Sequence, residues 1–271
     1  MTTAHVLEKW ETLNREYLEQ LKGKLVAVTF SAGKDSSAAL YLLNRVKEKY
    51  NFDILAFLYA FPRHRYTPEF EQQLKTFWDS RGVSLTYRIP DVDDSVLENK
   101  ENPCRPCQNL RKKALPELFT LVRRPVEDVV LVSGHSLWDL AGYALNRLVG
   151  DGLADSTTQA EVYSKERFLE ISQRFYIFLT MPEGYSVYRP MLVLNADEID
   201  LLCWENSLPV LDVTCRYSLM RPKKVLGGYF EKFGYRFSYR QVFEFARTYL
   251  KIAELDTIQS MSQDEYLTKR F

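Results

Sequence analysis

The chain has 271 residues, 46% of them hydrophobic, which suffices for one large core or for one core with a smaller appendage. It has 36 basic and 36 acidic residues and a formal net charge of +0. This balance excludes an overall positive field that would attract nucleic acid, although a local basic surface is still possible. Residues 1–21 are charged throughout, unlike a signal peptide, and no run of about 20 apolar residues follows. We therefore expect a cytoplasmic protein with no membrane partner.

The first half of the chain alternates between strand and helix patterns. Helical spacing of apolar residues predicts a helix over 4–21, and short apolar runs predict strands over 25–30, 52–59, 83–89 and 128–133. Helices are expected between them over 36–50 and 68–81. Apolar strands joined by helical crossovers are typical of a doubly wound α/β domain with a parallel sheet. Ligands of such domains bind beyond the carboxyl ends of the strands, where we place segments 31–37, 60–66 and 134–139.

The second half of the chain predicts a less regular arrangement. We expect a polar loop over 150–159, a helix over 163–174 and a hairpin made of 175–180 and 185–188. Further helices are expected over 196–206, 221–233 and 239–250. Asn195 and Glu198 have the spacing of a capping box at the start of the first of these three helices.

A loop of small residues lies between the first predicted strand and the helix that follows. It consists of Ser31, Ala32, Gly33, Lys34, Asp35, Ser36 and Ser37. Backbone N–H groups at a helix start, together with the helix dipole, favour an anion, and glycine allows a close backbone approach. The loop lacks the spacing of a Walker A motif. We predict that it binds phosphates, and an ordinary strand-to-helix turn is the alternative.

A second motif, Gly134-His135 with Asp139 four residues after the histidine, follows the strand predicted over 128–133. A histidine at a strand end and a carboxylate four residues on face the same way at a helix start. The two side chains either contact a nucleotide or magnesium, or they cap the helix and complement its dipole.

Three of the four cysteines are candidates for a soft-metal site. Cys104 and Cys107 form a Cys-x-x-Cys at the start of a predicted helix, and Cys215 lies far along the chain. Two thiolates at this spacing hold one metal or cluster, or form a redox pair. Zinc usually takes four protein ligands. We interpret Cys203, inside a predicted helix, as a core residue, and no histidine stands next to Cys215 in the sequence.

The phosphate loop resembles the Ser-Gly-Gly-x-Asp-Ser signature of the PP-loop family, also called adenine nucleotide α-hydrolase-like, with Ala32 in place of one glycine. The resemblance implies an enzyme that cleaves ATP between the α and β phosphates, with Lys34 and Asp35 near the phosphates and magnesium. The family's second signature, His-x-x-Asp-Asp, is kept in part, with Asp139 as the one aspartate of its pair.

The order of the motifs is similar to that of the sulfur-transferring PP-loop subgroup typified by tRNA 2-thiocytidine synthetase. In that subgroup a Cys-x-x-Cys followed by basic residues, here residues 110–113, lies between the loop and the Gly-His motif. In that subgroup a third cysteine comes after a strand, and residues 188–192 of this chain resemble that strand. The resemblance implies ATP, Mg²⁺ and a 4Fe–4S cluster as cofactors. It implies that Cys104, Cys107 and Cys215 hold the cluster and that they and Asp35 are catalytic, while residues 31–37, Gly134, His135 and Asp139 bind the nucleotide.

The reaction implied by this resemblance adenylates a nucleobase carbonyl oxygen and replaces that oxygen with sulfur. The acceptor is a tRNA or a free nucleobase or nucleoside, for example a purine in a pathway such as that of 6-thioguanine, and the sulfur donor is sulfide or a cysteine desulfurase. A PP-loop ligase that forms an amide and a zinc-stabilised nucleotide-binding protein are the alternatives. The resemblance also allows a homodimer, but no residue pattern in the sequence indicates an interface.

Two groups of side chains bear on the acceptor. A tRNA-binding protein usually has a basic face, and its candidate residues here are Arg63, Arg65, Arg111, Lys112, Lys113, Arg123, Arg124, Arg221, Lys223 and Lys224. The alternative is that these are solvated helix faces. Aromatic residues either cover a small-molecule pocket or, as we favour, belong to the core; they are Tyr163, Phe168, Phe175, Tyr176, Phe178, Tyr185 and Tyr188.

The predicted domain organisation has three parts. Residues 1–22 form an N-terminal helix, 23–220 a PP-loop ATP-pyrophosphatase domain with an insertion at about 150–185, and 221–271 a C-terminal helical region.

Overall fold

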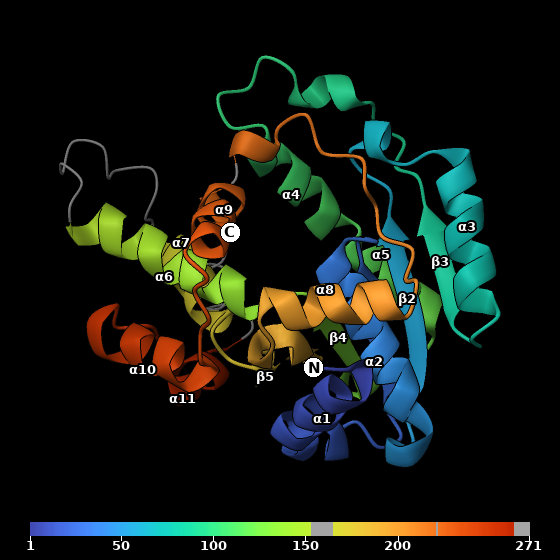
Figure 1. Cartoon of the computed structure of the whole chain (residues 1–271), viewed down its shortest axis with the longest axis horizontal. Coiled ribbons are helices and arrows are strands. Elements are labelled where there is room, and N and C mark those ends of the chain that lie inside the picture. Colours follow the sequence, from blue (N-terminus) through green and yellow to red (C-terminus); the bar gives the residue numbers. More distant parts are fainter. Residues whose placement is uncertain (153–164, 221, 263–271) are drawn as a thin grey trace.

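The computed structural model describes residues 1–152, 165–220 and 222–262 (Figure 1). The strands within these ranges are β1 (Leu25–Phe30), β2 (Asp53–Tyr59), β3 (Ser84–Arg88), β4 (Val129–Ser133), β5 (Phe178–Thr180) and β6 (Ser186–Tyr188). The helices are α1 (Thr3–Glu19), α2 (Lys34–Tyr50), α3 (Pro68–Asp79), α4 (Cys104–Lys113), α5 (Leu115–Val122), α6 (Leu137–Gly152), α7 (Lys165–Gln173), α8 (Ala196–Glu205), α9 (Pro222–Lys232), α10 (Tyr239–Tyr249) and α11 (Leu255–Gln259).

The described strands form one sheet in the order β3-β2-β1-β4-β6-β5. The pairs from β3 through β6 are parallel, and β5 runs antiparallel to β6, so the predicted parallel sheet and the predicted hairpin are both confirmed. The strand order reverses between β1 and β4. Ligands of open α/β sheets bind at such a switch point, beyond the carboxyl ends of the strands.

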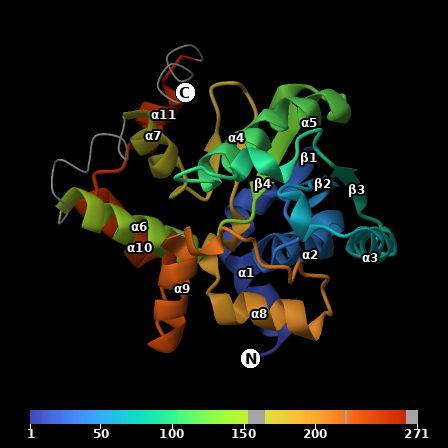
Figure 2. The ribbon, with the colours of Figure 1, turned by 90° about the horizontal axis from the view of Figure 1, so that it is seen from above.

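Both faces of the sheet are covered by apolar packing. Val26 and Val28 of β1 lie in the larger core, whereas Ala27 between them lies in a second core on the opposite face. β4 alternates in the same way, with Val130 in the first core and Leu131 in the second. The larger core includes residues of α1, α2, α3 and α8, and α5 contributes to the second, so the sheet lies between α5 and α2 in Figure 2. The continuous apolar strands of the sequence are therefore strands buried on both sides.

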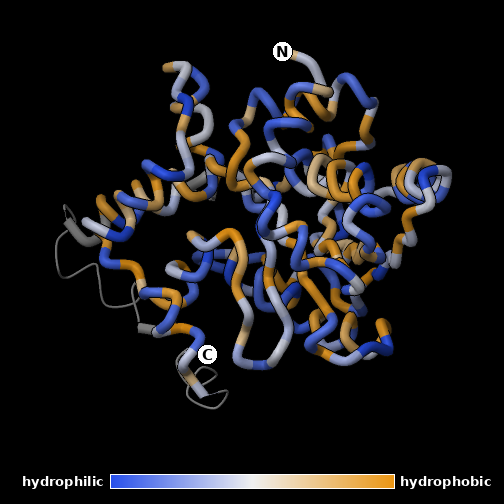
Figure 3. The backbone as a smooth tube through the Cα atoms, turned by 90° about the horizontal axis from the view of Figure 1, so that it is seen from below, coloured by the Kyte–Doolittle hydropathy of each residue, from blue (hydrophilic) through white to orange (hydrophobic). Residues whose placement is uncertain are grey.

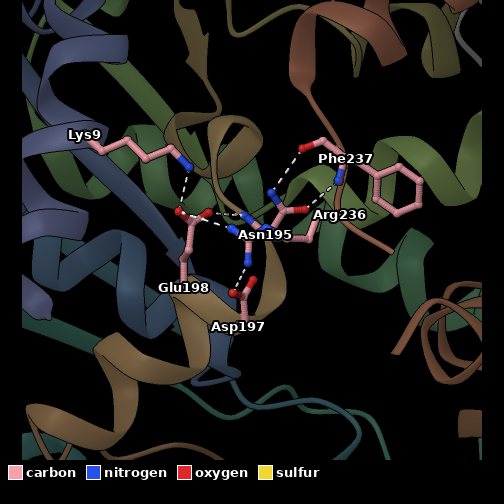
Figure 4. A network of polar contacts seen from close by, with 6 residues as sticks. All are labelled: Lys9, Asn195, Asp197, Glu198, Arg236 and Phe237. Atoms are coloured by element: carbon pink, nitrogen blue, oxygen red, sulfur yellow. Dashed lines mark hydrogen bonds and ion pairs between the residues drawn. The ribbon is translucent and has the colours of Figure 1, made fainter. Parts of the chain in front are cut away.

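The start of α8 contacts both α1 and the segment that follows α9. The predicted capping box is confirmed: the Asn195 side chain accepts from the backbone of the helix, and Glu198 accepts from Asn195 N at 2.8 Å. Glu198 also pairs with Lys9 of α1 at 2.6 Å, and Asn195 exchanges two hydrogen bonds with the backbone of Phe237 (Figure 4). These contacts hold α1 and the segment after α9 against the same helix end.

One expectation about the second half of the chain is wrong, and another, the placement of aromatic residues in the core, is confirmed. The loop expected from residue 150 is wrong for residues 150–152, because α6 continues to Gly152, and glycine is common where helices end; residues 153–159 lie outside the described ranges. The alternative in which aromatic side chains cover a pocket is wrong for Phe175, Tyr176, Tyr185 and Tyr188, which are buried in the two cores. Tyr163 lies outside the described ranges.

The described helices are not membrane spans. None of them is long and apolar enough to cross a bilayer, and blue hydrophilic stretches alternate with orange hydrophobic ones along the tube in Figure 3.

Candidate functional site

The loop 31–37 joins the end of β1 to the start of α2. Ala32 has a left-handed backbone (φ 54) and is fully buried, and Gly33 is extended at the N-cap position of α2. The Ser36 hydroxyl accepts from Ser31 N at 3.2 Å and donates to the Gly33 carbonyl at 3.0 Å. The loop is thus closed by its own side chains around the first turn of a helix, where N–H groups have no partner inside the helix and favour an anion.

Lys34 extends from this loop toward α8. Its Nζ lies 2.9 Å and 3.1 Å from the two carboxylate oxygens of Asp200. The thiol of Cys203, one helical turn further along α8, donates to the Lys34 carbonyl at 3.6 Å. Burial raises the pKa of the Cys203 thiol to about 12, and the nearby Asp200 and Asp35 charges act in the same direction. Cys203 is therefore a protonated thiol packed against the main core, as interpreted from the sequence.

The Gly-His motif lies against the phosphate loop. A Cβ on Gly134 would approach both Cα and N of Ser36 to 3.0 Å, so the backbone of this turn lies against the start of α2, and a side chain there would require that backbone to shift. His135 Nδ1 is hydrogen-bonded to Ser133 Oγ at the end of β4. Asp139 accepts from Ser136 N at 2.8 Å and from its hydroxyl at 3.1 Å, which is the geometry of a carboxylate that caps the start of α6.

A chain of contacts leads from this motif to α4, the helix that contains the Cys-x-x-Cys. The rings of His135 and Tyr143 lie 6.2 Å apart, and the Arg174 guanidinium is 4.9 Å from the centre of the Tyr143 ring. Glu170 binds Arg174 at 2.6 Å and Lys112 of α4 at 3.0 Å. Partly buried charges of both signs therefore connect the end of β4 with α4.

The cysteines of the predicted metal site lie on α4 and on the segment 209–217. All four cysteines are thiols without a disulfide. Cys107 and Cys215 are buried, and Cys104 is half-buried. Cys107 packs with Phe61 and Leu97 in a small apolar cluster, and Tyr217, two residues after Cys215, packs on the same cluster.

The segment 209–217 is hydrogen-bonded to the phosphate loop. Leu211 N donates to the Ala32 carbonyl at 2.7 Å, and the Ser37 hydroxyl donates to the Pro209 carbonyl at 3.3 Å. The structure thus brings the segment that contains Cys215 to the phosphate loop at one end and to the surroundings of Cys107 at the other.

The segment 60–66 also meets the phosphate loop, because the Tyr66 hydroxyl donates to the Ser31 carbonyl at 3.2 Å. The three segments that follow β1, β2 and β4 therefore come together at one edge of the sheet, as expected. His64, in a 3₁₀ turn at Arg63–Arg65, accepts a hydrogen bond from Arg216 N at 3.3 Å. The sequence alone did not identify this histidine, because it lies about 150 residues before Cys215.

The three cysteines suit a metal cluster in the chemistry of their side chains. Within the described residues, however, no group of three or more His, Cys, Asp or Glu side chains is arranged to hold a metal ion. The fold therefore gathers the segments that contain these cysteines, and it does not show their sulfur atoms as an assembled set of ligands.

Half of the basic residues proposed for an RNA face are engaged within the protein. Arg63 donates to Pro90 O, Arg65 to Val213 O and Arg111 to Phe61 O, while Lys112 pairs with Glu170 and Arg124 with Asp53. Lys113, Arg123 and Lys224 are exposed, and the side chains of Arg221 and Lys223 are not among those described.

Comparison with known proteins identifies two curated relatives. The tRNA(Ile)-lysidine synthase of Thermosipho africanus is 28% identical over 214 residues, which are 77% of this chain and 44% of that protein. The tRNA(Ile)-lysidine synthase of Prochlorococcus marinus is 23% identical over 227 residues, 80% of this chain and 60% of that protein. The chain thus spans about half the length of the curated relatives it matches. No family model matches the chain.

A solved structure shows the same fold. The U34-tRNA thiolase NcsA from Methanococcus maripaludis, determined with its [4Fe-4S] cluster, has a TM-score of 0.64, is 20% identical, and is matched over 93% of this chain and 79% of that one.

The sheet order defines an α/β protein whose loop 31–37 lies at the switch point between β1 and β4, where ligands of such sheets generally bind. The fold shared with NcsA and the sequence similarity to the lysidine synthases agree with the resemblance to PP-loop ATPases recognised in the sequence.

Proposed function

We propose that this protein is an ATP-dependent sulfurtransferase that adenylates a nucleobase carbonyl oxygen of a tRNA and replaces that oxygen with sulfur. The observation that carries the proposal is the position of the segment 209–217. Its hydrogen bonds to Ala32 and Ser37 attach it to the phosphate loop, while Tyr217 shares an apolar cluster with Cys107. These contacts support the proposal, because they bring the segment of the proposed sulfur-delivering Cys215 to the loop proposed to activate the oxygen.

In the proposed reaction, the first turn of α2 binds the phosphates of ATP. Lys34 exchanges its partner Asp200 for phosphate oxygens, and Asp35, His135 and Asp139 lie around the nucleotide and magnesium. The nucleobase oxygen attacks the α-phosphate, and pyrophosphate leaves. A hydrosulfide sulfur then attacks the same nucleobase carbon, and AMP leaves with the original oxygen. Positioning and charge stabilisation are the main contributions of a protein to such steps.

Cys104, Cys107 and Cys215 would hold a 4Fe–4S cluster, which supplies the sulfur for transfer when it is bound. The cysteine chemistry and the fold shared with NcsA support this assignment. The segment 209–217 would bring Cys215 toward α4, and the burial of Cys107 and Cys215 would keep water away from the sulfur.

The test uses protein purified without oxygen and reconstituted with iron and sulfide, incubated with tRNA, ATP and sulfide. Digested nucleosides are analysed by mass spectrometry for exchange of oxygen by sulfur. Cys215→Ala is expected to lose thiolation and to keep ATP binding, whereas Cys203→Ala, which changes a thiol outside the proposed ligand set, is expected to thiolate. Full thiolation by Cys215→Ala would refute the role of the cluster. Free nucleobases in a parallel reaction show whether the acceptor is a small molecule.

A second candidate is a PP-loop ligase in which an amine attacks the adenylate. One observation favours it: both curated relatives are tRNA(Ile)-lysidine synthases. Metal-free protein incubated with tRNA, ATP and lysine separates the two functions. A lysine adduct on the tRNA, formed equally by the wild type and Cys215→Ala, would establish the ligase and exclude the thiolase.

A further inference from the structure

His64 connects two segments that are far apart in the sequence. Its Nδ1 lies 2.6 Å from Asp94 Oδ2, and its Nε2 lies 3.3 Å from Arg216 N. A backbone N–H can only donate, so Nε2 must be the acceptor. Nδ1 therefore carries the hydrogen and donates it to Asp94, which fixes the imidazole as one neutral tautomer.

Asp94 fixes the orientation of this imidazole. Its Oδ1 accepts from Arg63 N at 2.7 Å, and its Oδ2 accepts from His64 N at 2.9 Å in addition to the bond from the ring. Burial alone would raise the pKa of Asp94, but the hydrogen bonds from His64 and Arg63 outweigh it and hold the pKa below its usual value. The carboxylate is therefore an anion at neutral pH, and the side chains of His64 and Asp94 are only 11% and 17% exposed.

We propose that His64, oriented by Asp94, is a positioning residue for Cys215. It accepts the N–H of Arg216, the residue directly after the cysteine. Its neighbour Arg65 donates from Nε to the carbonyl of Val213, two residues before the cysteine, at 3.0 Å. The cysteine is thereby held on both sides by one 3₁₀ turn.

The surrounding backbone explains why such an anchor is needed. Around Cys215, the residues Asp212, Val213, Thr214 and Arg216 are exposed, yet Cys215 itself is 8% exposed. The segment lies outside the described helices and strands from Ser207 to Tyr217, so no regular backbone ladder holds it. Its hydrogen bonds to the 3₁₀ turn therefore keep the thiol directed inward.

The same turn also lies next to the surroundings of Cys107. Phe61, two residues before Arg63, packs against Cys107, and Leu97, three residues after Asp94, belongs to the same cluster. His64 and Asp94 thus join the surroundings of Cys107 to the backbone of Cys215. The consequence for sulfur transfer rests on the proposed function, whereas the anchoring itself does not.

The anchoring is tested on metal-free, reduced protein by alkylation with iodoacetamide, with the modification of each cysteine followed by peptide mass spectrometry. The rate at Cys215 is divided by the rate at Cys203, a thiol that is bound to the phosphate loop and not to this turn. His64→Ala removes the acceptor and is expected to raise this ratio about fivefold, the effect of one net hydrogen bond. His64→Gln restores an acceptor oxygen and is expected to restore most of the protection. His5→Ala, which changes an exposed histidine of α1, is the matched control and should leave the ratio unchanged.

An unchanged ratio in His64→Ala overturns the proposal. Equal acceleration at both cysteines also overturns it, because that result means general loosening of the fold. Thiolation of tRNA is measured separately in the reconstituted variants. If the proposed function is wrong, no protein thiolates and the alkylation ratio still changes; if the positioning role is wrong, the wild type thiolates and the ratio stays constant.

Discussion

Ala32 occupies a backbone conformation that usually belongs to glycine, and its replacement by glycine has a calculable outcome. A left-handed backbone costs an L-residue about 1–2 kcal/mol, which Ala32→Gly would relieve. Against this, glycine adds about 0.4–1 kcal/mol of entropy to the unfolded chain, and the loss of one fully buried methyl group costs about 0.8 kcal/mol. These contributions nearly cancel, so we expect the free energy of unfolding to change by less than about 1 kcal/mol.

Ala39→Gly is the matched control, because Ala39 is equally buried but lies inside α2. There glycine loses helix propensity of about 1 kcal/mol as well as the methyl burial, and no strain is relieved, so a cost of about 2 kcal/mol is expected. Equilibrium unfolding in urea at neutral pH, on metal-free protein, measures both variants. If Ala32→Gly destabilised the protein as much as Ala39→Gly, the strain assigned to the phosphate loop would be refuted.

Three further predictions concern the phosphate loop and the N-terminal helix. Gly134→Ala places a Cβ 3.0 Å from the backbone of Ser36 and is expected to weaken ATP binding at least about tenfold in calorimetry, whereas Gly228→Ala, with open space around its Cβ, should bind ATP normally. Equal ATP affinities of Gly134→Ala and the wild type would show that the backbone around Ser36 accommodates the added Cβ without loss of binding. Asp200→Asn frees Lys34 from an exposed ion pair, so stability should change by less than about 1 kcal/mol while ATP binding tightens; weaker binding would mean that Asp200 itself serves the nucleotide. The Lys49 hydrogen bond is the main cause that holds the pKa of Glu11 below its usual value, so Glu11 stabilises the fold above its unfolded pKa of about 4.3 and loses this effect as the pH falls through the folded value. Glu11→Gln should therefore be less stable than the wild type at pH 7 but not near pH 3, and a deficit that persists in acid would contradict the assignment.

The sheet was predictable from the sequence because its strands are buried on both faces. Leu25–Phe30 and Val129–Ser133 are almost wholly apolar, and burial on two sides is the physical condition that such runs satisfy. The capping box at Asn195 was predictable for a different reason, since it depends on two side chains three residues apart. Local patterns of this kind need no knowledge of the remainder of the chain.

The end of α6 was not predictable in the same way. Gly150 and Gly152 interrupt the pattern and indicate a loop, but glycine is tolerated in the last turn of a helix that is already held by packing along its earlier residues. Helix α5 and helix α11 were also missed, because each is short and carries few residues of a helical repeat.

The candidate site was predictable only in its separate parts. The phosphate loop and the Cys-x-x-Cys are visible as continuous motifs, whereas the contact between Ala32 and Leu211 joins residues that share no local pattern. His64 shows the same limit, because its importance depends on Asp94 and Arg216, which only the fold brings to it. Whether the predicted residues bind ATP, magnesium and a cluster stays a prediction for the experiments described above.

One hydrogen bond, from Leu211 N to the Ala32 carbonyl, has a thermodynamic consequence for the whole site. It joins the backbone of the phosphate loop to a segment whose cysteine lies four residues further on. A ligand that stabilises the present shape of either partner stabilises that of the other through this bond, and the coupling free energy must be the same in both directions. A nucleotide that orders the loop would therefore also order Cys215. A ligand bound at Cys215 would in turn raise the affinity for the nucleotide by the same factor.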